Sequence, residues 1–375
     1  MSTARWVAVF RAPLVNPAEQ IRLAEPRSFA DETLRQVLRV AGGGTRLRVH
    51  LTNRYSENEL VIGAARLARH KTADEIVAET DTAVRFAGST QVRIPAGATA
   101  ISDPVDLPVT AGAELALSLY LPEDTGLAAF AHIPAQPGWV VAGDRTSAAA
   151  LPAPEEIGSR FFLTGVDVLT TADAPVLVAF GDSWFEGVGS TPGANRRSVD
   201  ALNARLPRGW AVNQGIGGTR LLTDEIGEHG LSRFERDVLS VPGVTGVWVN
   251  FGINDLILSG TATAEQLIAG FTELARLAHQ AGLPIYADTI GPFAGAIYPG
   301  LSVAEGIPVR RAVNEWLRGT PVFDAVFDIA AAVQDPDRPD FIRAEFDSGD
   351  GMHLNDAGAQ AMAKTVDLTA LAAHS

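Results

Sequence analysis

The hydrophobic pattern of this chain changes its period near residue 170, and no single kind of sheet fits both sides of the change. Before that point apolar and polar residues alternate, as in residues 46–51 and 114–121. After it, short runs are apolar almost throughout, as in residues 176–180 and 247–251. Alternation indicates antiparallel strands with one buried face, whereas continuous apolar runs are typical of parallel strands buried on both faces.

We therefore expect two domains, residues 1–170 and residues 171–375. This division suits a chain of 375 residues, because domains usually contain roughly 100–200. In the first domain, short alternating strands between Gly- and Pro-rich turns predict an antiparallel β-sandwich of the jelly-roll type. Residues 84–86 and 92–94 are expected to pair there as a hairpin.

The second domain repeats apolar strands and helical patterns, which predicts an α/β fold with a parallel sheet between two layers of helices. The clearest helical pattern covers residues 263–281 and is followed by Gly282. In such sheets ligands bind at the carboxyl ends of the strands. The loops that follow the strands are therefore the places to search for chemistry.

Composition excludes several classes of protein. The chain contains no cysteine, which rules out a disulfide scaffold, an iron–sulfur cluster, a Cys-based zinc site and a cysteine nucleophile. Acidic residues outnumber basic ones by 44 to 30, giving a formal net charge of −14, and the arginines form no basic stripe. Because such a chain repels phosphate backbones, we expect no nucleic-acid partner.

Membranes are not expected as partners either. No apolar run approaches the roughly 20 residues of a membrane span, and residues 1–6 lack the apolar core of a signal peptide. We therefore expect a cytoplasmic protein, or a secreted one if a leader was removed.

The first loop of interest follows residues 176–180 and reads Gly181-Asp182-Ser183. A serine at this point has its hydroxyl at the carboxyl edge of the sheet and its N–H at the positive end of a helix. The alternative is that Asp182 or Ser183 only caps the helix. Phe185 stands where the Gly-x-Ser-x-Gly turn of another hydrolase class requires glycine, so that turn is excluded.

Two further loops offer hydrogen-bond donors. Residues 213–220 are rich in glycine, which lets backbone N–H groups face a ligand closely, although a plain tight turn is also compatible. Arg220 stands where a dinucleotide-binding fingerprint needs glycine, so we reject that fingerprint. In residues 252–255, Asn254 can direct its side-chain amide toward the same edge, or can cap the next turn.

The fourth loop carries an acid and a histidine. Asp350 and His353 are three residues apart, so one turn can place carboxylate and imidazole side by side, a pattern that the other histidines lack. A metal site at Asp347, Asp350, His353 and Asp356 is a weaker interpretation, because a second histidine is absent. Together the four loops supply a nucleophile, oxyanion donors and an Asp–His base.

This pattern resembles the SGNH/GDSL hydrolase superfamily, in particular two-domain bacterial arylesterases and acylhydrolases. The resemblance implies a flavodoxin-like fold and an active site that needs no metal and no organic cofactor. It also implies a role for each motif residue: Ser183 as nucleophile, His353 as general base, Asp350 as the group that orients it, and Ser183, Gly218 and Asn254 as the oxyanion hole.

The chain departs from the family pattern at three positions. Trp184 replaces leucine, Thr219 stands where relatives often have asparagine, and Leu354 where proline is usual. We expect Trp184 and Thr219 to bind substrate by reshaping the pocket.

The expected function is that of a serine carboxylic-ester hydrolase acting on short-acyl or aryl esters, with O-acetylated carbohydrate among the candidate substrates. Two alternatives stay open at this point. An acyltransferase or thioesterase would use the same acyl-serine, and a carbohydrate-binding protein would retain only a vestigial site. The partner is then a small-molecule or carbohydrate ester, and the sequence leaves the oligomeric state open.

Overall fold

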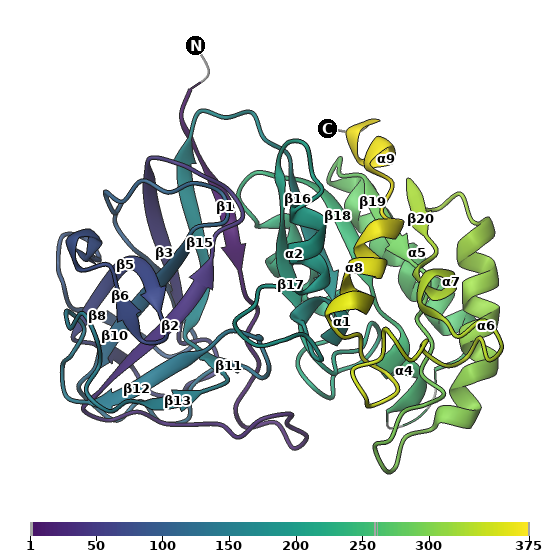
Figure 1. Cartoon of the computed structure of the whole chain (residues 1–375), viewed down its shortest axis with the longest axis horizontal. Coiled ribbons are helices and arrows are strands. Elements are labelled where there is room, and N and C mark those ends of the chain that lie inside the picture. The colour runs from purple at the N-terminus through teal and green to yellow at the C-terminus, as the bar shows by residue number, and fades with distance from the viewer. Residues whose placement is uncertain (1–2, 259, 261, 374–375) are drawn as a thin grey trace. The chain divides into compact units, whose positions relative to one another are not determined.

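The computed structural model describes residues 3–258, 260 and 262–373. Its contacts divide the chain into one unit up to Asp173 and a second unit from Ala174 (Figure 1). The expected domain limits, 1–170 and 171–375, stay a prediction. Within the described ranges, no helix is both long enough and apolar enough to cross a membrane.

The first unit is built from antiparallel strands. Its two larger sheets follow the orders β1-β15-β3-β9 and β13-β12-β2-β10-β5-β6, with β7 paired to β5. Two small sheets, β4-β8 and β11-β14, complete it. The bounds are β1 (Arg5–Arg11), β2 (Glu32–Arg39), β3 (Arg46–Thr52), β4 (Leu60–Ile62), β5 (Ala64–Thr72), β6 (Glu75–Ile76), β7 (Thr82–Ala83), β8 (Val92–Ile94), β9 (Thr99–Ile101), β10 (Glu114–Leu121), β11 (Phe130–Ala131), β12 (Gly138–Ala142), β13 (Glu155–Ile157), β14 (Arg160–Phe161) and β15 (Leu163–Thr170), with a 3₁₀ turn at Ala78–Thr80.

The antiparallel strands expected at residues 46–51 and 114–121 are confirmed as β3 and β10. The expected hairpin is wrong, because β8 pairs with β4 instead of with residues 84–86. A three-residue strand has too little pattern to specify its partner, and a turn bridging Phe86 and Ser89 occupies the preceding segment. The packing of the two larger sheets as a sandwich stays a prediction.

The second unit contains a parallel sheet in the order β17-β16-β18-β19-β20, which confirms a mixed α/β fold with a parallel sheet. The strands are β16 (Val176–Gly181), β17 (Trp210–Gly215), β18 (Val244–Asn250), β19 (Ile285–Asp288) and β20 (Ala325–Phe327). Gly181 is in register with Gly215 on one side and with Asn250 on the other. Three strands therefore end level with one another, and their loops begin at the same edge.

Helices connect these strands (Figure 1). Their bounds are α1 (Ser183–Glu186), α2 (Ser198–Asn203), α3 (Gly230–Phe234), the π-helical turn η2 (Glu235–Leu239), α4 (Ile253–Ile257), α5 (Ala264–Gln280), α6 (Val303–Gly319), α7 (Ile329–Val333), α8 (Asp356–Thr365) and α9 (Leu368–Ala373). The helix expected at 263–281 is confirmed as α5. Thr263 and Gln266 form a capping box at its start, through side-chain bonds to each other's N–H groups of 3.3 and 2.9 Å.

Candidate active site

Ser183 is the first residue of α1, immediately beyond the end of β16, and is buried. Asp182 caps the helix, its Oδ1 accepting the N–H of Trp184 at 3.1 Å. The strand reaches this turn only because of glycine: a Cβ on Gly181 would overlap the carbonyl of Asn250. The cap is therefore Asp182, which leaves the hydroxyl of Ser183 available for another partner.

That partner is His353, which reaches Ser183 from the fourth loop. The Nε2 atom of His353 lies 2.9 Å from Ser183 Oγ, and its Nδ1 atom lies 2.6 Å from Asp350 Oδ2. All three side chains are at least largely buried. The structure thus brings together the three residues that the sequence suggested as nucleophile, base and orienting acid, although they are up to 170 residues apart.

Asp350 is held by more groups than His353. Its Oδ1 accepts the N–H groups of Met352 at 3.0 Å and of His353 at 2.9 Å, and its Oδ2 accepts the hydroxyl of Tyr298 at 3.0 Å. Burial alone would raise the pKa of Asp350, but His353 and the backbone donors outweigh it and hold the pKa well below its usual range. The carboxylate is therefore ionised at neutral pH and is a strong acceptor.

Gly218 lies in a tight turn of the second loop, closed by a 3.2 Å hydrogen bond from Thr219 N–H to the carbonyl of Ile216. Its φ of +78° and its contact with Ile226, which a Cβ would overlap, both require glycine. The side chain of Asn254 joins the third loop to this turn, because its Nδ2 donates to the carbonyl of Thr219 at 2.9 Å.

Some hydrogen-bond donors at this edge of the sheet are not used by the protein's own hydrogen bonds. Within the described ranges, the N–H groups of Ser183 and Gly218 donate to no other protein group. The amide of Asn254 has two hydrogens, and the bond to Thr219 uses one of them. These groups are thus available to a bound oxygen.

Asp255, the neighbour of Asn254, holds the end of the second loop through hydrogen bonds. Its two carboxylate oxygens accept the N–H groups of Leu221 at 2.8 Å and of Leu222 at 3.0 Å. Burial raises the pKa of this carboxyl to about 6, although the two backbone donors oppose the shift.

A buried arginine, which sequence reasoning missed, contacts the end of the strand that leads to Ser183. Arg233 donates to the carbonyl of Gly181 at 2.7 Å and to that of Gln214 at 2.9 Å, and its guanidinium lies 4.2 Å from the ring centroid of Phe180. Arg233 thereby ties together the ends of two adjacent strands. Nothing in the helical pattern around it distinguishes it from a surface arginine.

Two buried acids share this region. Burial raises the pKa of Asp182 to about 7. Burial also raises the pKa of Asp288 well above its usual range, although Trp248 and Asn250 both donate to its carboxylate, at 2.8 and 3.1 Å. Each of these groups binds the proton more tightly than an exposed carboxyl does.

Trp184 and Thr219 are both buried. The indole of Trp184 donates to the carbonyl of Met352 at 2.9 Å, and the hydroxyl of Thr219 donates to the carbonyl of Glu228 at 3.1 Å. These contacts join loops to one another. The expected role of the two residues in substrate binding stays a prediction.

Two carboxylates of the suggested metal site, Asp347 and Asp356, instead accept hydrogen bonds from nearby loops. Asp347 accepts the N–H groups of Gly349 and Gly351, at 2.8 and 3.0 Å, and Asp356 accepts the N–H and hydroxyl of Thr191, both at 2.8 Å. In the part of the chain that the structure describes, no group of three or more His, Asp or Glu side chains is arranged to hold a metal ion.

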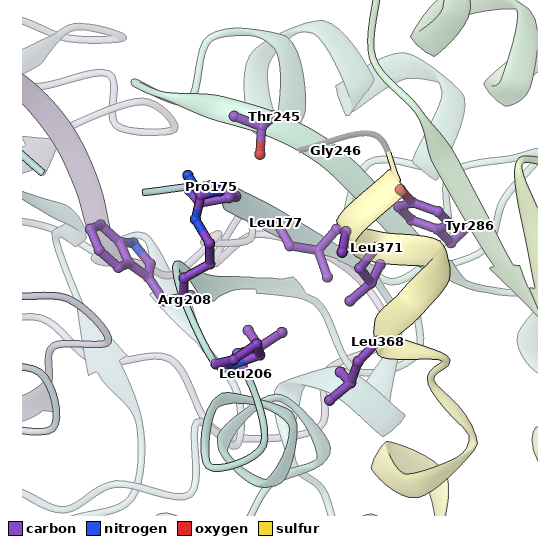
Figure 2. A pocket seen from close by; sticks show the side chains of 12 residues that line it. Pro175, Leu177, Leu206, Arg208, Thr245, Gly246, Tyr286, Leu368 and Leu371 are labelled. Atoms are coloured by element: carbon purple, nitrogen blue, oxygen red, sulfur yellow. The ribbon is translucent and has the colours of Figure 1, made fainter. Parts of the chain in front are cut away.

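A separate cavity of about 120 Å³ lies at the other end of the parallel strands. Figure 2 shows it between the start of β16, near Leu177, and helix α9, which contributes Leu368 and Leu371. Ser183 and Asn254 follow the carboxyl ends of the strands, so this cavity belongs to the opposite edge of the sheet.

Residues 179–361 match the GDSL-like lipase/acylhydrolase family. No curated protein matches the chain.

Among solved structures, the chain is similar to the aryl esterase of M. smegmatis, with 15% identity and a TM-score of 0.43 over 54% of this chain and 100% of that one. It is similar to a carbohydrate acetylesterase of Sinorhizobium meliloti, with 16% identity and a TM-score of 0.43 over 53% and 99%. It is also similar to a GDSL-like lipase of Bacteroides thetaiotaomicron, with 15% identity and a TM-score of 0.41 over 53% and 88%.

The matched residues extend from the middle of β16 into α8 and include all four loops. Residues 179–361 therefore form a GDSL-like lipase/acylhydrolase domain, which confirms the resemblance that the motifs of this chain show to the SGNH/GDSL hydrolases.

Proposed function

We propose that the protein is a serine carboxylic-ester hydrolase that works through an acyl-serine at Ser183. The observation that supports this most is the unbroken series of hydrogen bonds from Ser183 Oγ through His353 to Asp350. A serine hydroxyl is a weak nucleophile until a neighbouring imidazole takes its proton, and a carboxylate on the far nitrogen keeps that imidazole in the useful tautomer.

In the proposed acylation step, Ser183 Oγ attacks the ester carbonyl while its proton moves to His353 Nε2. The carbonyl oxygen becomes negative and accepts hydrogen bonds from the N–H groups of Ser183, Gly218 and Asn254. In well-studied hydrolases each such donor stabilises the transition state by about 2.7–4 kcal/mol. Collapse of the tetrahedral intermediate breaks the bond to the alcohol, and His353 gives that alcohol its proton. Water then attacks the acyl-serine by the same route and releases the acid.

The finer architecture is part of this proposal. We infer that helices cover both faces of the parallel sheet in a flavodoxin-like arrangement, and that the two larger sheets of the first unit pack as a sandwich. The continuous apolar strands β16 and β18, buried along most of their length, support the first inference. The antiparallel pairing of the larger sheets of the first unit supports the second.

The test is a panel of esters with short to long acyl chains, together with acetylated xylan, given to wild type and to Ser183→Ala. The substitution should lower kcat about a thousandfold or more, and His353→Ala should be similarly damaging. Asp350→Asn should cost less, because the amide oxygen of asparagine can still accept the Nδ1–H of His353. Ser240→Ala, which removes an exposed hydroxyl bonded to the carbonyl of Arg236, is the matched control.

Normal turnover by Ser183→Ala would refute the proposal. Addition of competing alcohols or thiols to the assay separates hydrolysis from acyl transfer, since a transferase would give the new ester as its main product. Failure of Ser183 to react with a fluorophosphonate probe would instead favour a binding protein with a vestigial site.

A further inference from the structure

Helix α1 ends in a buried acid that the proposed reaction does not use. Glu186 is the last residue of this helix, three positions after Ser183, and is only 5% exposed. Its Oε2 atom accepts the N–H of Gly217 at 2.5 Å. A buried carboxylate is costly unless it is hydrogen-bonded or paired with a cation. The acid is therefore retained inside the protein together with its contact to the second loop.

The second loop and α1 are in direct contact where this hydrogen bond forms. A Cβ on Gly215 would overlap the backbone nitrogen of Glu186, so the end of β17 and the end of α1 touch. The N–H of Ile216 donates to the carbonyl of Gly181 at 3.1 Å. The carboxylate of Glu186 then extends this contact by one further residue, to Gly217.

Residues 216–219 form a turn that depends on its hydrogen bonds. Gly217 and Gly218 are adjacent in it, and two successive glycines allow a wide range of backbone conformations. A hydrogen bond inside the turn, one from Asn254 at its end and one to Glu186 near its start hold it in the observed conformation. The bond to Glu186 is the one that connects the turn to α1.

A buried cation offsets the negative charge of this acid. A Cβ on Gly187 would overlap the side chain of Arg197, which therefore packs beside the end of α1. Burial opposes the charge of Arg197, but attraction to Asp200 and Glu186 outweighs it and raises the pKa of the guanidinium. The carboxylate can thus hold the turn without leaving an unbalanced negative charge near the oxygen that becomes negative in the proposed reaction.

We propose that Glu186 is a positioning residue for the oxyanion hole. It holds the turn of residues 216–219 at a fixed place relative to α1, so that the N–H groups of Gly218 and Ser183 can bind the same oxygen. Glu186 itself touches neither the ester nor the reacting atoms. This inference rests on the proposed ester hydrolase function and adds a residue that supports its transition state.

Three substitutions separate the hydrogen bond of Glu186 from its charge. Glu186→Ala removes both, Glu186→Asp keeps the charge but ends one carbon short of Gly217, and Glu186→Gln keeps an oxygen that can accept the N–H. We expect Ala and Asp to lower kcat on p-nitrophenyl acetate about ten- to a hundredfold with KM within about twofold, because a misplaced donor acts mainly on the transition state. Gln should restore kcat to within about threefold of wild type.

A trifluoromethyl ketone reports on the oxyanion hole directly. Ser183 Oγ adds to its carbonyl carbon, the hydroxyl proton moves to His353, and the carbonyl oxygen becomes an anion that the N–H donors bind. Its inhibition constant should therefore rise in Glu186→Ala and Glu186→Asp by about the factor by which kcat falls. A role of Glu186 in folding alone would not give this proportionality.

Asp324 provides the matched control. Its carboxylate also accepts a backbone N–H, that of Ile285 at 2.8 Å, but where β19 begins, at the opposite edge of the sheet. Asp324→Ala should lower the thermal midpoint while leaving kcat and the inhibition constant within about twofold of wild type. The thermal midpoint of each variant verifies that it is folded, and Glu186→Asp carries the test if Glu186→Ala does not fold.

Wild-type kcat in folded Glu186→Asp would overturn the positioning role. A lower kcat with an unchanged inhibition constant for the ketone would overturn it too, because Glu186 would then act elsewhere than on the oxyanion. If wild type hydrolyses esters and Ser183→Ala does not, such results refute the positioning role alone. If wild type hydrolyses no ester, the proposed function fails and the role of Glu186 fails with it.

Discussion

The indole Nε1–H of Trp184 donates a 2.9 Å hydrogen bond to the carbonyl of Met352, and these two residues directly follow Ser183 and directly precede His353 in the chain. The bond therefore joins the helix that carries Ser183 to the loop that carries His353. Both partners are buried, so water does not compete for it. A leucine at position 184 would have no donor for this bond.

Trp184→Phe tests this connection, because it keeps a ring and removes the N–H. We expect kcat on p-nitrophenyl acetate to fall about three- to tenfold with KM within about twofold, since the distance between Ser183 and His353 is no longer fixed. The rate of labelling by a fluorophosphonate should fall in parallel. Trp316→Phe, on α6, removes an indole that packs on Phe323 and should leave kcat unchanged. An unchanged kcat in Trp184→Phe would refute the positioning role.

Gly291 tests the same indole from its other side. A Cβ at this glycine would overlap the ring of Trp184, so Gly291→Ala forces the indole or the backbone to move. We expect a loss of about 1–3 kcal/mol in the free energy of unfolding and a lower kcat. Gly319→Ala at the end of α6 has open space around it and is the control. Urea unfolding measures the free energy of unfolding of both variants. Equal values for Gly291→Ala and Gly319→Ala would contradict the predicted overlap with Trp184.

Asn254 should affect turnover much more than substrate affinity. Asn254→Ala removes one proposed oxyanion donor, and we expect kcat to fall about a hundred- to a thousandfold with KM little changed. Because the amide also holds the carbonyl of Thr219, the thermal midpoint should fall by a few degrees.

Asn203 provides the matched control for that variant. Its amide likewise donates to a backbone carbonyl, that of Ala211 at 3.0 Å, but away from the four loops. Asn203→Ala should therefore reduce stability while sparing kcat. If Asn254→Ala instead raised KM and left kcat intact, Asn254 would be a substrate-binding residue.

The parts of this structure that follow from local pattern were predictable from the sequence. Continuous apolar runs predicted parallel strands, and such strands end at one edge, which is why loops far apart in the chain meet. In the structure, Gly181 is in register with Gly215 and Asn250, so the strands β16, β17 and β18 end at the same level. Pairing of short strands was not predictable, because β8 and β4 have three residues each.

Supporting contacts were not predictable either. Tyr298 reaches Asp350 across 52 positions of the chain, and Arg233 reaches Gly181 across the same separation. Neither residue stands in a sequence motif. Each acquires its role only because the folded backbone brings it next to its partner. Sequence pattern thus identifies the groups that could react, and only the fold identifies the groups that hold them.

A pH-sensitive position lies in the first unit. His132 is 2% exposed, and neither of its ring nitrogens has a hydrogen-bond partner among the described residues. The edge of its ring meets Phe130, with centroids 4.9 Å apart. Burial without a partner lowers the pKa of this imidazole to about 4, because the charged form would lose its hydration.

The low pKa of His132 predicts a loss of stability in mild acid. Below the ordinary histidine value of about 6.5 the unfolded chain binds a proton at this residue, whereas the folded chain does not until about pH 4. The free energy of unfolding should therefore decrease as the pH falls from about 7 to 4, by about 3 kcal/mol in total, and this contribution should level off below pH 4. His132→Leu has no imidazole to titrate. In urea unfolding, its free energy of unfolding relative to that of wild type should therefore be higher at pH 5 than at pH 7.5. A difference between the two proteins that does not change with pH would show that the imidazole is not kept neutral by burial.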